Sequence, residues 1–285
     1  MQFKDSRKIS FLIIFVIYLL ASAVGIVSYF FLPVNIIWLK LLIADILATA
    51  FTFIFSVILK NASVYDPYWS VQPIVILYVC MLMHGTGASG ILILVVVSIW
   101  GIRLTANWAY TFNGLSHQDW RYSMLKEKTG RFYPIINFFG IHIIPTLVVY
   151  ACTLPALYVV LFSPAVNFGS VIFFIVSISA VILQGIADIQ MHTYRKSRTT
   201  VFMRTGLWKF SRHPNYLGEI MMWWGIAFSA ICVLPNLWWL IIGAILNTLL
   251  FLFVSIPMAD KRQSYKPGFD EYKKSTHMLL PIKKF

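Results

Sequence analysis

Residues 10–32 read SFLIIFVIYLLASAVGIVSYFFL, a run without one charged side chain. A transmembrane helix needs about 20 such residues to cross a hydrocarbon core about 30 Å thick. Because every backbone polar group must be satisfied within lipid, each crossing is expected to be a helix. The sequence therefore predicts an all-α, polytopic membrane helix bundle with about eight transmembrane helices, in a range of six to ten. The apolar runs lie near 10–32, 36–59, 70–84, 88–107, 138–163, 168–187, 218–233 and 236–257.

The composition of the 285-residue chain excludes soluble classes of protein. Hydrophobic residues make up 59% of the chain and charged residues 12%, whereas a soluble domain carries about 25% charge. The excess apolar surface must face lipid. The cysteines Cys80, Cys152 and Cys232 all lie in apolar runs, where a thiol packs as a small hydrophobe, so no disulfide framework is expected.

The formal net charge of +13 is interpreted as basic cytoplasmic loops rather than as a nucleic-acid surface. If residues 1–9 are cytoplasmic, the outer links 32–36, 84–89, 163–168 and 234–236 contain no Lys or Arg. Lys40 is then the one basic residue near an outer helix end. This pattern predicts that both termini face the cytoplasm, as do the polar segments 107–133, 188–215 and 259–285. A bacterial inner membrane and an endoplasmic reticulum fit equally.

A glycine motif, GTGASG at residues 85–90, matches the G-x-G-x-x-G pattern of dinucleotide-binding folds. That fingerprint requires a strand before it and a βαβ unit around it. Here the glycines join two transmembrane runs on the predicted outer side. We therefore interpret the motif as a tight interhelical turn.

Two polar segments of the C-terminal half suit an anionic ligand. Asp188, His192 and Arg195 recur at i, i+4 and i+7, which places them on one helix face. Such a cluster is typical of a membrane interface, yet it also suits ribose hydroxyls and phosphates. Residues 205–219 read TGLWKFSRHPNYLGE. Pro214 suits a helix's first turn, Ser211 or a neighbour is expected to cap that helix, and its positive end favours an anion.

This run, with Asp188 and Arg195 before it and KRQSYKPGFDEY at 261–272 after it, resembles the C-terminal domain of the steroid 5-alpha-reductase superfamily. The resemblance covers about residues 185–283 and is strongest to a poorly characterised, largely microbial branch. It implies a membrane domain whose cytoplasmic half binds NADPH and transfers hydride to a C=C bond conjugated to a carbonyl. The cofactor residues that it implies are Asp188, His192, Arg195, Arg198, Arg212, His213, Asn215, Tyr216, Glu219, Arg262 and Tyr265.

The resemblance also implies roles within this set. Asn215 would reach the nicotinamide amide, and Arg262 and Tyr265 would close the pocket. The substrate would be a lipophilic steroid-, isoprenoid- or fatty-enone-like molecule. We expect one domain over residues 1–285, with 1–137 on the substrate side and 138–285 on the cofactor side. Membrane lipids are the other expected partners, and no obligate protein partner is inferred.

Two other functions stay open from sequence. An Arg-His-Pro-x-Tyr element also occurs in the isoprenylcysteine carboxyl methyltransferases, which use S-adenosylmethionine, so a membrane methyltransferase is the alternative. A non-enzymatic lipid-binding or transport protein is the third. The basic side chains of 188–219 favour the several phosphate charges of NADPH over S-adenosylmethionine.

The N-terminal half holds the candidates for the substrate side. The reductases use a Glu and a Tyr there to polarise the carbonyl, and Tyr65, Asp66 and Tyr68 are the predicted catalytic residues. Asp45 lies inside a predicted membrane helix, where an ionisable group is either functional or paired, here with Lys40. Residues 107–131 are expected to cover the cofactor. No His, Cys and carboxylate spacing meets the rules for a metal site.

Overall fold

A computed structural model describes residues 4–197 and 200–281. These residues form helices and no β-strand, and one isolated bridge links Ser211 to His277. The chain divides into two compact units. Unit 1 comprises Met1–Met83 and Trp100–Leu154, and unit 2 comprises His84–Ile99 and Pro155–Phe285. The functional division at residues 137/138 stays a prediction.

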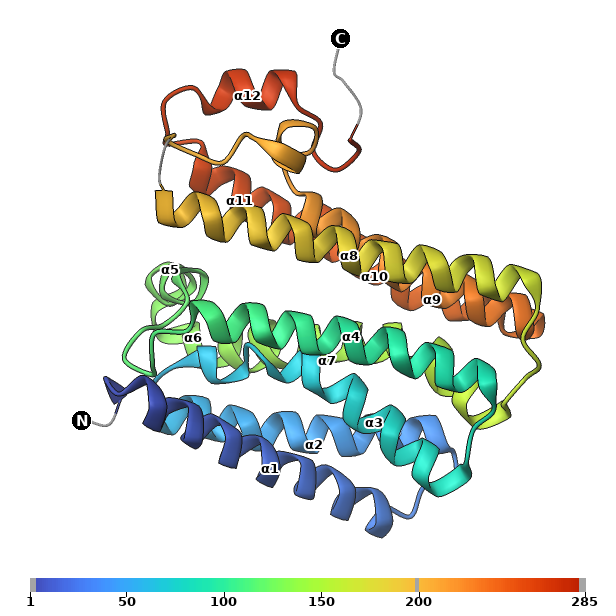
Figure 1. The fold of residues 1–285 in the computed structure, drawn as a ribbon. Coiled ribbons are helices and arrows are strands. Elements are labelled where there is room, and N and C mark those ends of the chain that lie inside the picture. The colour runs from blue at the N-terminus through green and yellow to red at the C-terminus, as the bar shows by residue number, and fades with distance from the viewer. Residues whose placement is uncertain (1–3, 198–199, 282–285) are drawn as a thin grey trace. The chain divides into compact units, whose positions relative to one another are not determined.

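The helices follow the apolar runs (Figure 1). Up to residue 162 the elements are, in chain order, α1 (Arg7–Phe31), α2 (Ile37–Ile58), η2 (Ala62–Tyr65), α3 (Tyr68–His84), α4 (Ala88–Thr111), α5 (Trp120–Thr129), η3 (Gly130–Phe132), α6 (Tyr133–Ile135), η4 (Ile136–Ile143) and α7 (Ile144–Phe162). After residue 162 they are α8 (Phe168–Ser197), η5 (Gly206–Lys209), α9 (Pro214–Val233), η6 (Pro235–Ile241), α10 (Ile242–Leu250), η7 (Phe251–Ser255), α11 (Ile256–Gln263) and α12 (Phe269–Ser275).

Within the described residues, seven helical stretches are long and apolar enough to cross a membrane. They match seven of the eight predicted runs, and α3, with 17 residues, matches the eighth. At 1.5 Å per residue, α3 is about 26 Å long, slightly less than a full hydrocarbon core. The prediction of a polytopic, all-helical membrane protein is confirmed.

Large apolar side chains cover the outer faces of these helices. Phe31, Leu82, Phe168 and Phe253 are each more than 70% exposed. Such exposure is unfavourable in water and favourable in lipid. The protein is therefore an integral, multi-pass membrane protein.

Small residues bring α1 and α2 together in unit 1. The Cβ position of Gly25 lies 3.6 Å from Ala48 Cβ and 3.7 Å from the Ala44 carbonyl oxygen. Close backbone approach of this kind drives helix association in membranes, where lipid competes for apolar side chains. The same small residues leave space beside α3.

In unit 2, α8 and α9 form an antiparallel pair (Figure 1). Gly218 of α9 packs on α8 so closely that a Cβ there would lie 2.7 Å from the Ala180 carbonyl oxygen. Farther along, Ser177 Oγ donates to the Met222 carbonyl oxygen at 3.3 Å, and Ser229 Oγ donates to that of Ser170 at 3.0 Å. The contacts align the C-terminal end of α8 with the start of α9.

The glycine motif at residues 85–90 lies where α3 ends and α4 begins. Gly85 has φ +72°, a left-handed conformation that favours glycine. Gly87 N–H donates to Ser163 Oγ at 3.0 Å. The predicted interhelical turn is confirmed.

The α8–α9 contact gives a stability prediction. Gly218→Ala is expected to lower the free energy of unfolding by about 1–3 kcal/mol, because its methyl group overlaps backbone of α8. Thermal unfolding of detergent-purified protein measures the change. Gly140→Ala is the control, since its Cβ meets only Ile136 Cγ2, at an ordinary 3.6 Å. Equal unfolding temperatures for the two variants would contradict the tight contact.

Candidate functional site

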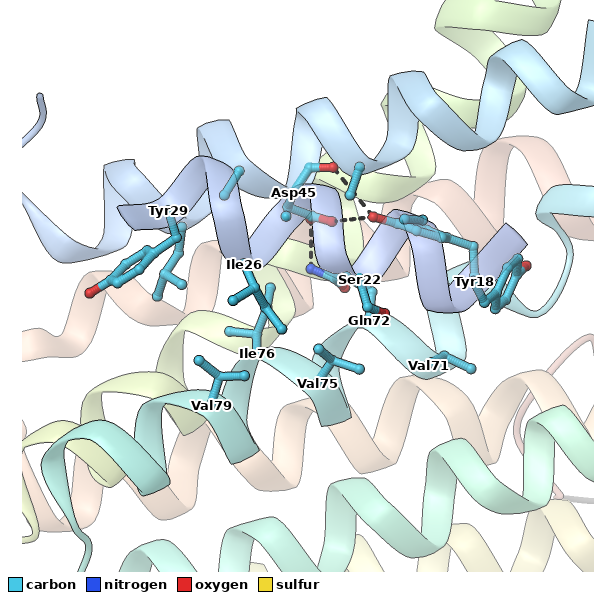
Figure 2. Close-up of a pocket in the computed structure, with 16 residues that line it drawn as sticks. Tyr18, Ser22, Ile26, Tyr29, Asp45, Val71, Gln72, Val75, Ile76 and Val79 are labelled. Atoms are coloured by element: carbon cyan, nitrogen blue, oxygen red, sulfur yellow. Dashed lines mark hydrogen bonds between the residues drawn. The ribbon is translucent and has the colours of Figure 1, made fainter. Parts of the chain in front are cut away.

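Unit 1 contains an open pocket between α1, α2 and α3, and its empty space of about 590 Å³ includes the mouth of the pocket (Figure 2). Most of its lining is aliphatic, and Tyr18 and Tyr29 lie toward its two ends. Its polar lining residues include Ser22, Asp45 and Gln72. An apolar cavity with a few convergent polar groups is the usual form of a small-molecule site. The lining comprises Tyr18, Ala21, Ser22, Gly25, Ile26, Tyr29, Leu41, Ala44, Asp45, Ala48, Tyr68, Val71, Gln72, Val75, Ile76 and Val79.

A carboxyl group held by two side chains of α3 is the chemical centre of this pocket. Tyr68 Oη donates to Asp45 Oδ1 at 2.9 Å, and Gln72 Nε2 donates to Asp45 Oδ2 at 2.6 Å. All three residues are at most 6% exposed. Lys40 does not fill the pairing role considered from sequence, since its Nζ lies 4.9 Å from the ring centre of Tyr29. Asp45 is thus bound to the pocket's own polar groups.

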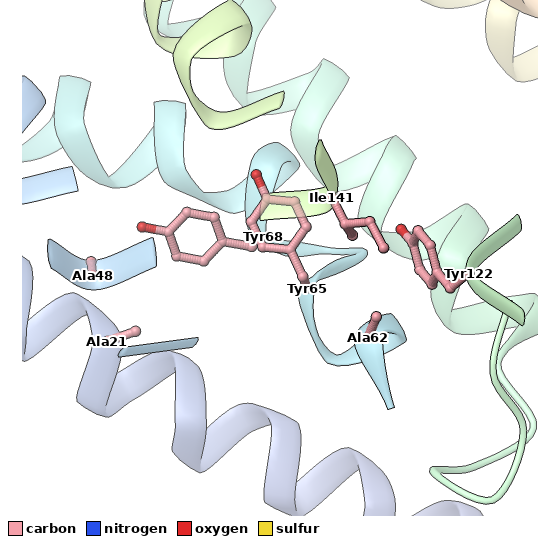
Figure 3. Packing of buried hydrophobic residues seen from close by; sticks show 7 residues of the cluster. All are labelled: Ala21, Ala48, Ala62, Tyr65, Tyr68, Tyr122 and Ile141. Atoms are coloured by element: carbon pink, nitrogen blue, oxygen red, sulfur yellow. The ribbon is translucent and has the colours of Figure 1, made fainter. Parts of the chain in front are cut away.

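The three predicted catalytic residues separate in the structure. Tyr68 lines the pocket. Tyr65 stacks on Tyr68 with ring centres 5.4 Å apart (Figure 3). Its hydroxyl is 2.7 Å from Thr146 Oγ1, and neither residue lines the pocket. Thr146 Oγ1 is in turn 3.0 Å from Thr49 Oγ1. Tyr65 therefore belongs to a buried hydroxyl network that braces Tyr68.

Asp66 lies at the polar end of unit 1 rather than in the pocket. It accepts a hydrogen bond from Tyr122 Oη, and the preceding segment is anchored by the Asp119 N–H, which donates to Ser63 Oγ at 2.8 Å. Burial raises the pKa of Asp66 to about 6, although the Arg121 guanidinium and the Tyr122 hydrogen bond lower it. The segment expected to cover the cofactor thus packs on residues 61–66 of its own unit; that role stays a prediction.

In unit 2 the structure gathers the described cofactor candidates at one end. Asp188 and His192 follow Ala187, whose carbonyl oxygen accepts from Trp208 Nε1 at 3.2 Å. This contact sets the last turns of α8 beside the segment that leads into α9. Arg195, Arg262 and Tyr265 are exposed at this end. Arg198 lies outside the described residues.

The start of α9 matches its sequence pattern in part. Pro214 occupies the first turn as predicted, but the residue before the helix is His213, and no side chain caps it. Ser211 Oγ instead accepts from the His213 N–H at 3.3 Å. Asn215 Oδ1 is buried and has no hydrogen-bond partner within residues 4–197 and 200–281. The helix end thus presents N–H groups and an amide acceptor.

Arg212 and His213 are held by a carboxylate that sequence reasoning missed. Arg212 Nη2 donates to Asp260 Oδ2 at 3.1 Å, and His213 Nε2 lies 3.0 Å from Asp260 Oδ1. Arg212 Nη1 also donates to the Thr276 carbonyl oxygen at 2.6 Å. Arg212 therefore ties the C-terminal segment to the start of α9. The sequence around Arg212 does not indicate that its partner is Asp260, which lies 48 residues away in the chain.

The remaining candidates of α9 also contact protein groups. The His213 and Tyr216 rings stack at 5.2 Å with an interplanar angle of 6°, and Glu219 Oε1 accepts from Trp223 Nε1 at 3.0 Å. These contacts fix the ring and the carboxylate beside Asn215. Among the residues that the structure describes, no three His, Cys, Asp or Glu side chains gather in a way that could hold a metal ion.

Fold and polar ends define an integral, multi-pass membrane protein, and comparisons with known proteins give its family. The chain matches the family described as Protein of unknown function (DUF1295) over residues 52–276 and belongs to it. It is similar to an uncharacterized protein of Schizosaccharomyces pombe, with 28% identity over 198 residues, 59% of this chain. The chain spans 57% of that relative's length. No solved structure matches it.

The raised pKa of Asp66 gives a pH prediction. Its folded pKa of about 6 exceeds the unfolded value of about 4, so the folded state binds the proton more tightly. The stabilising contribution is complete below about pH 4 and is lost as the pH rises through 6. Thermal unfolding of wild type at pH 4 to 7 measures it.

Asp66→Asn is the matched variant, because it keeps an acceptor for Tyr122 but does not titrate. It is expected to lose less stability than wild type between pH 4 and 7. Identical pH profiles for the two proteins would contradict the raised pKa.

Proposed function

We propose that this protein is a membrane-embedded, NADPH-dependent reductase that transfers hydride to an activated C=C bond of a lipophilic substrate. The observation that carries the proposal is the Asp45–Tyr68 pair in the apolar pocket of unit 1. A second support is the likeness of residues 185–283 to the steroid 5-alpha-reductase superfamily. The pair supplies the acid and the tyrosine that carbonyl polarisation in such reductases requires.

Unit 1 is the proposed substrate side. The pocket lies between apolar helices, so a lipid-soluble molecule can enter from the bilayer. A carboxyl group away from water is favoured in its neutral form, because charge there is costly. In the structure Tyr68 Oη donates to Asp45 Oδ1. When Asp45 is neutral, the direction of this bond can reverse, so that Asp45 Oδ1–H donates to Tyr68 Oη and the Tyr68 hydrogen is free for a substrate carbonyl. That hydrogen bond strengthens as negative charge develops on the carbonyl oxygen.

Tyr68 has the best position of the three predicted catalytic residues for this role. Asp45 and Gln72 orient the polar end of the pocket, while Tyr65 acts through the Thr146 and Thr49 hydroxyls. The proposal assigns polarisation to Tyr68 and its support to Asp45. When bound, NADPH would supply hydride for the β-carbon of the substrate, and a proton from water would complete the α-carbon. Tyr68 would hold the carbonyl oxygen as that oxygen gains negative charge.

Unit 2 is the proposed cofactor side. NADPH supplies the hydride, and the residues present fit it: Asn215 Oδ1 lacks a partner among the described residues and suits a carboxamide N–H. The uncapped N–H groups of α9 and the exposed Arg195 suit phosphate. Asp188 and His192 are assigned to the adenosine end, and Arg262 and Tyr265 to its outer edge. The active face is proposed to be cytoplasmic.

Cofactor binding separates the proposed functions. NADPH at a concentration 100 times its Kd is expected to stabilise detergent-purified protein by about 2.7 kcal/mol, and NADH less. Asn215→Ala and Arg195→Ala should remove most of this stabilisation, whereas the control Asn35→Ala, an exposed residue of the link after α1, should keep it. Stabilisation by S-adenosylmethionine alone would favour the methyltransferase. No stabilisation by NADPH, NADH or S-adenosylmethionine would favour a non-enzymatic role.

Turnover tests the assignment within unit 1. With NADPH and a long-chain enone, Tyr68→Phe is expected to lower kcat by about 100-fold or more, because the donor to the developing oxyanion is lost. Tyr65→Phe should have a smaller effect, since its hydroxyl bonds Thr146. Tyr78→Phe is the control, being an exposed tyrosine of the same helix. A Tyr68→Phe enzyme with wild-type kcat would refute the assignment.

A further inference from the structure

The pocket of unit 1 contains a hydrogen-bond acceptor that the reductase proposal does not use. Gln72 lines the pocket and is 6% exposed. Its Nε2 donates to Asp45 Oδ2, but its Oε1 is buried with no hydrogen-bond partner among the described residues (Figure 2). A buried carbonyl without a hydrogen-bond partner destabilises a protein, because it has lost its hydrogen bonds to water. Such a group in a cavity indicates a missing donor.

The orientation of this amide is determined by its neighbours. Asp45 Oδ1 is occupied by Tyr68, so Oδ2 is the oxygen that Gln72 meets, at 2.6 Å. With the proton of neutral Asp45 on Oδ1, toward Tyr68, Oδ2 is a carbonyl oxygen, which accepts from an N–H group and repels another oxygen. The NH₂ group of Gln72 therefore faces Asp45, and its carbonyl oxygen is turned away from Asp45.

The rest of the lining leaves this oxygen without a donor. Tyr18 Oη donates to the Val64 carbonyl oxygen at 2.8 Å, and the Ser22 hydroxyl makes no hydrogen bond to Oε1 among the described residues. Beyond Gln72, α3 presents Val75, Ile76 and Val79 to the pocket. A ligand with a hydroxyl or N–H group on an apolar skeleton suits this lining, since it donates to Oε1 while its carbon skeleton fills the aliphatic part.

We propose that the pocket binds an amphiphile whose polar head carries a hydrogen-bond donor, a hydroxyl or an N–H, that meets Gln72 Oε1. The head lies near Gln72 and Tyr68, whose ring centre is 5.9 Å from that of Tyr18, and the apolar tail lies along Val75 and Val79 toward Tyr29 (Figure 2). From Tyr18 to Tyr29 the pocket follows eleven residues of α1, about 16 Å along the helix. This length fits a lipid rather than a small metabolite.

This inference rests on the proposed function for the carbonyl that Tyr68 contacts, but the donor is a separate requirement. Together they define the substrate class as a lipophilic, conjugated carbonyl compound with a hydroxyl or N–H a few bonds from the carbonyl. A plain enone would satisfy Tyr68 and leave Gln72 Oε1 unpaired. Gln72 is then the residue that distinguishes a plain enone from an enone that carries a hydroxyl or N–H group.

Ligand binding without cofactor tests the donor. The probes are a long-chain hydroxy-enone and its methyl ether, which differ in one donor hydrogen and one methyl group. Their Kd values are measured on the full chain in lipid nanodiscs by tryptophan fluorescence. Wild type is expected to bind the hydroxy compound about tenfold more tightly, the effect of one hydrogen bond to a buried acceptor. Equal affinities, or no binding of either probe, would overturn the proposal.

Variants assign the preference to Gln72. Gln72→Met keeps the length but removes the acceptor, so the preference should fall to about twofold or less. Gln72→Glu keeps an acceptor oxygen and should retain the preference. This second variant tests the acceptor even if Gln72→Met folds poorly. Gln184→Met is the matched control, because Gln184 is also buried, in α8 of unit 2; it should keep the tenfold preference. A preference that persists in Gln72→Met would overturn the assignment.

The outcome is independent of the reductase proposal, since no hydride is transferred. If NADPH fails to stabilise the protein while the hydroxy-enone preference holds, the proposed function falls and the ligand class stands. If NADPH binds and the preference is absent, the ligand class falls and the proposed function stands.

Discussion

The scarcity of hydrogen-bond partners inside a membrane is the constraint on which this structure depends. Apolar runs satisfy their backbone as helices, and each polar side chain at membrane depth must find a partner on another helix. Asp45 meets this requirement through Tyr68 and Gln72, and Thr49 meets it through Thr146. The polar contacts that join α2 to α3 also build the pocket, so structural and chemical roles coincide in the same side chains.

Each unit has one polar end, and the two ends differ in chemistry. In unit 1, carboxylates, tyrosines and a basic segment meet near Asp66 and Tyr122. In unit 2, Asp260 holds Arg212 and His213, and Arg212 ties the C-terminal segment to the start of α9. The apolar pocket belongs to unit 1 and the amide acceptor of Asn215 to unit 2. These two environments match the proposed lipophilic substrate in unit 1 and the proposed charged, soluble cofactor in unit 2.

Sequence reasoning reached the helices and part of the candidate site. Hydropathy located all eight apolar runs because crossing a bilayer needs a length and composition that are local properties of the chain. Asp45 is predictable for the same reason, because it is a carboxyl inside an apolar run. Gln72 is not predictable, because an uncharged amide in such a run changes neither the charge nor the hydropathy of the run enough to mark it. Asp260 was missed because its partners lie far away in the chain.

The sequence by itself determined that this is a helical, multi-pass membrane protein with three polar segments, since charge and hydropathy need no knowledge of packing. Only the tertiary structure decided which side chains meet. Tyr68 reaches Asp45 across 23 residues and Gln72 reaches it across 27. Those contacts depend on the rotation of α3 against α2, and on the small residues of α1 and α2 that leave room for a pocket. Neither is encoded in any local pattern.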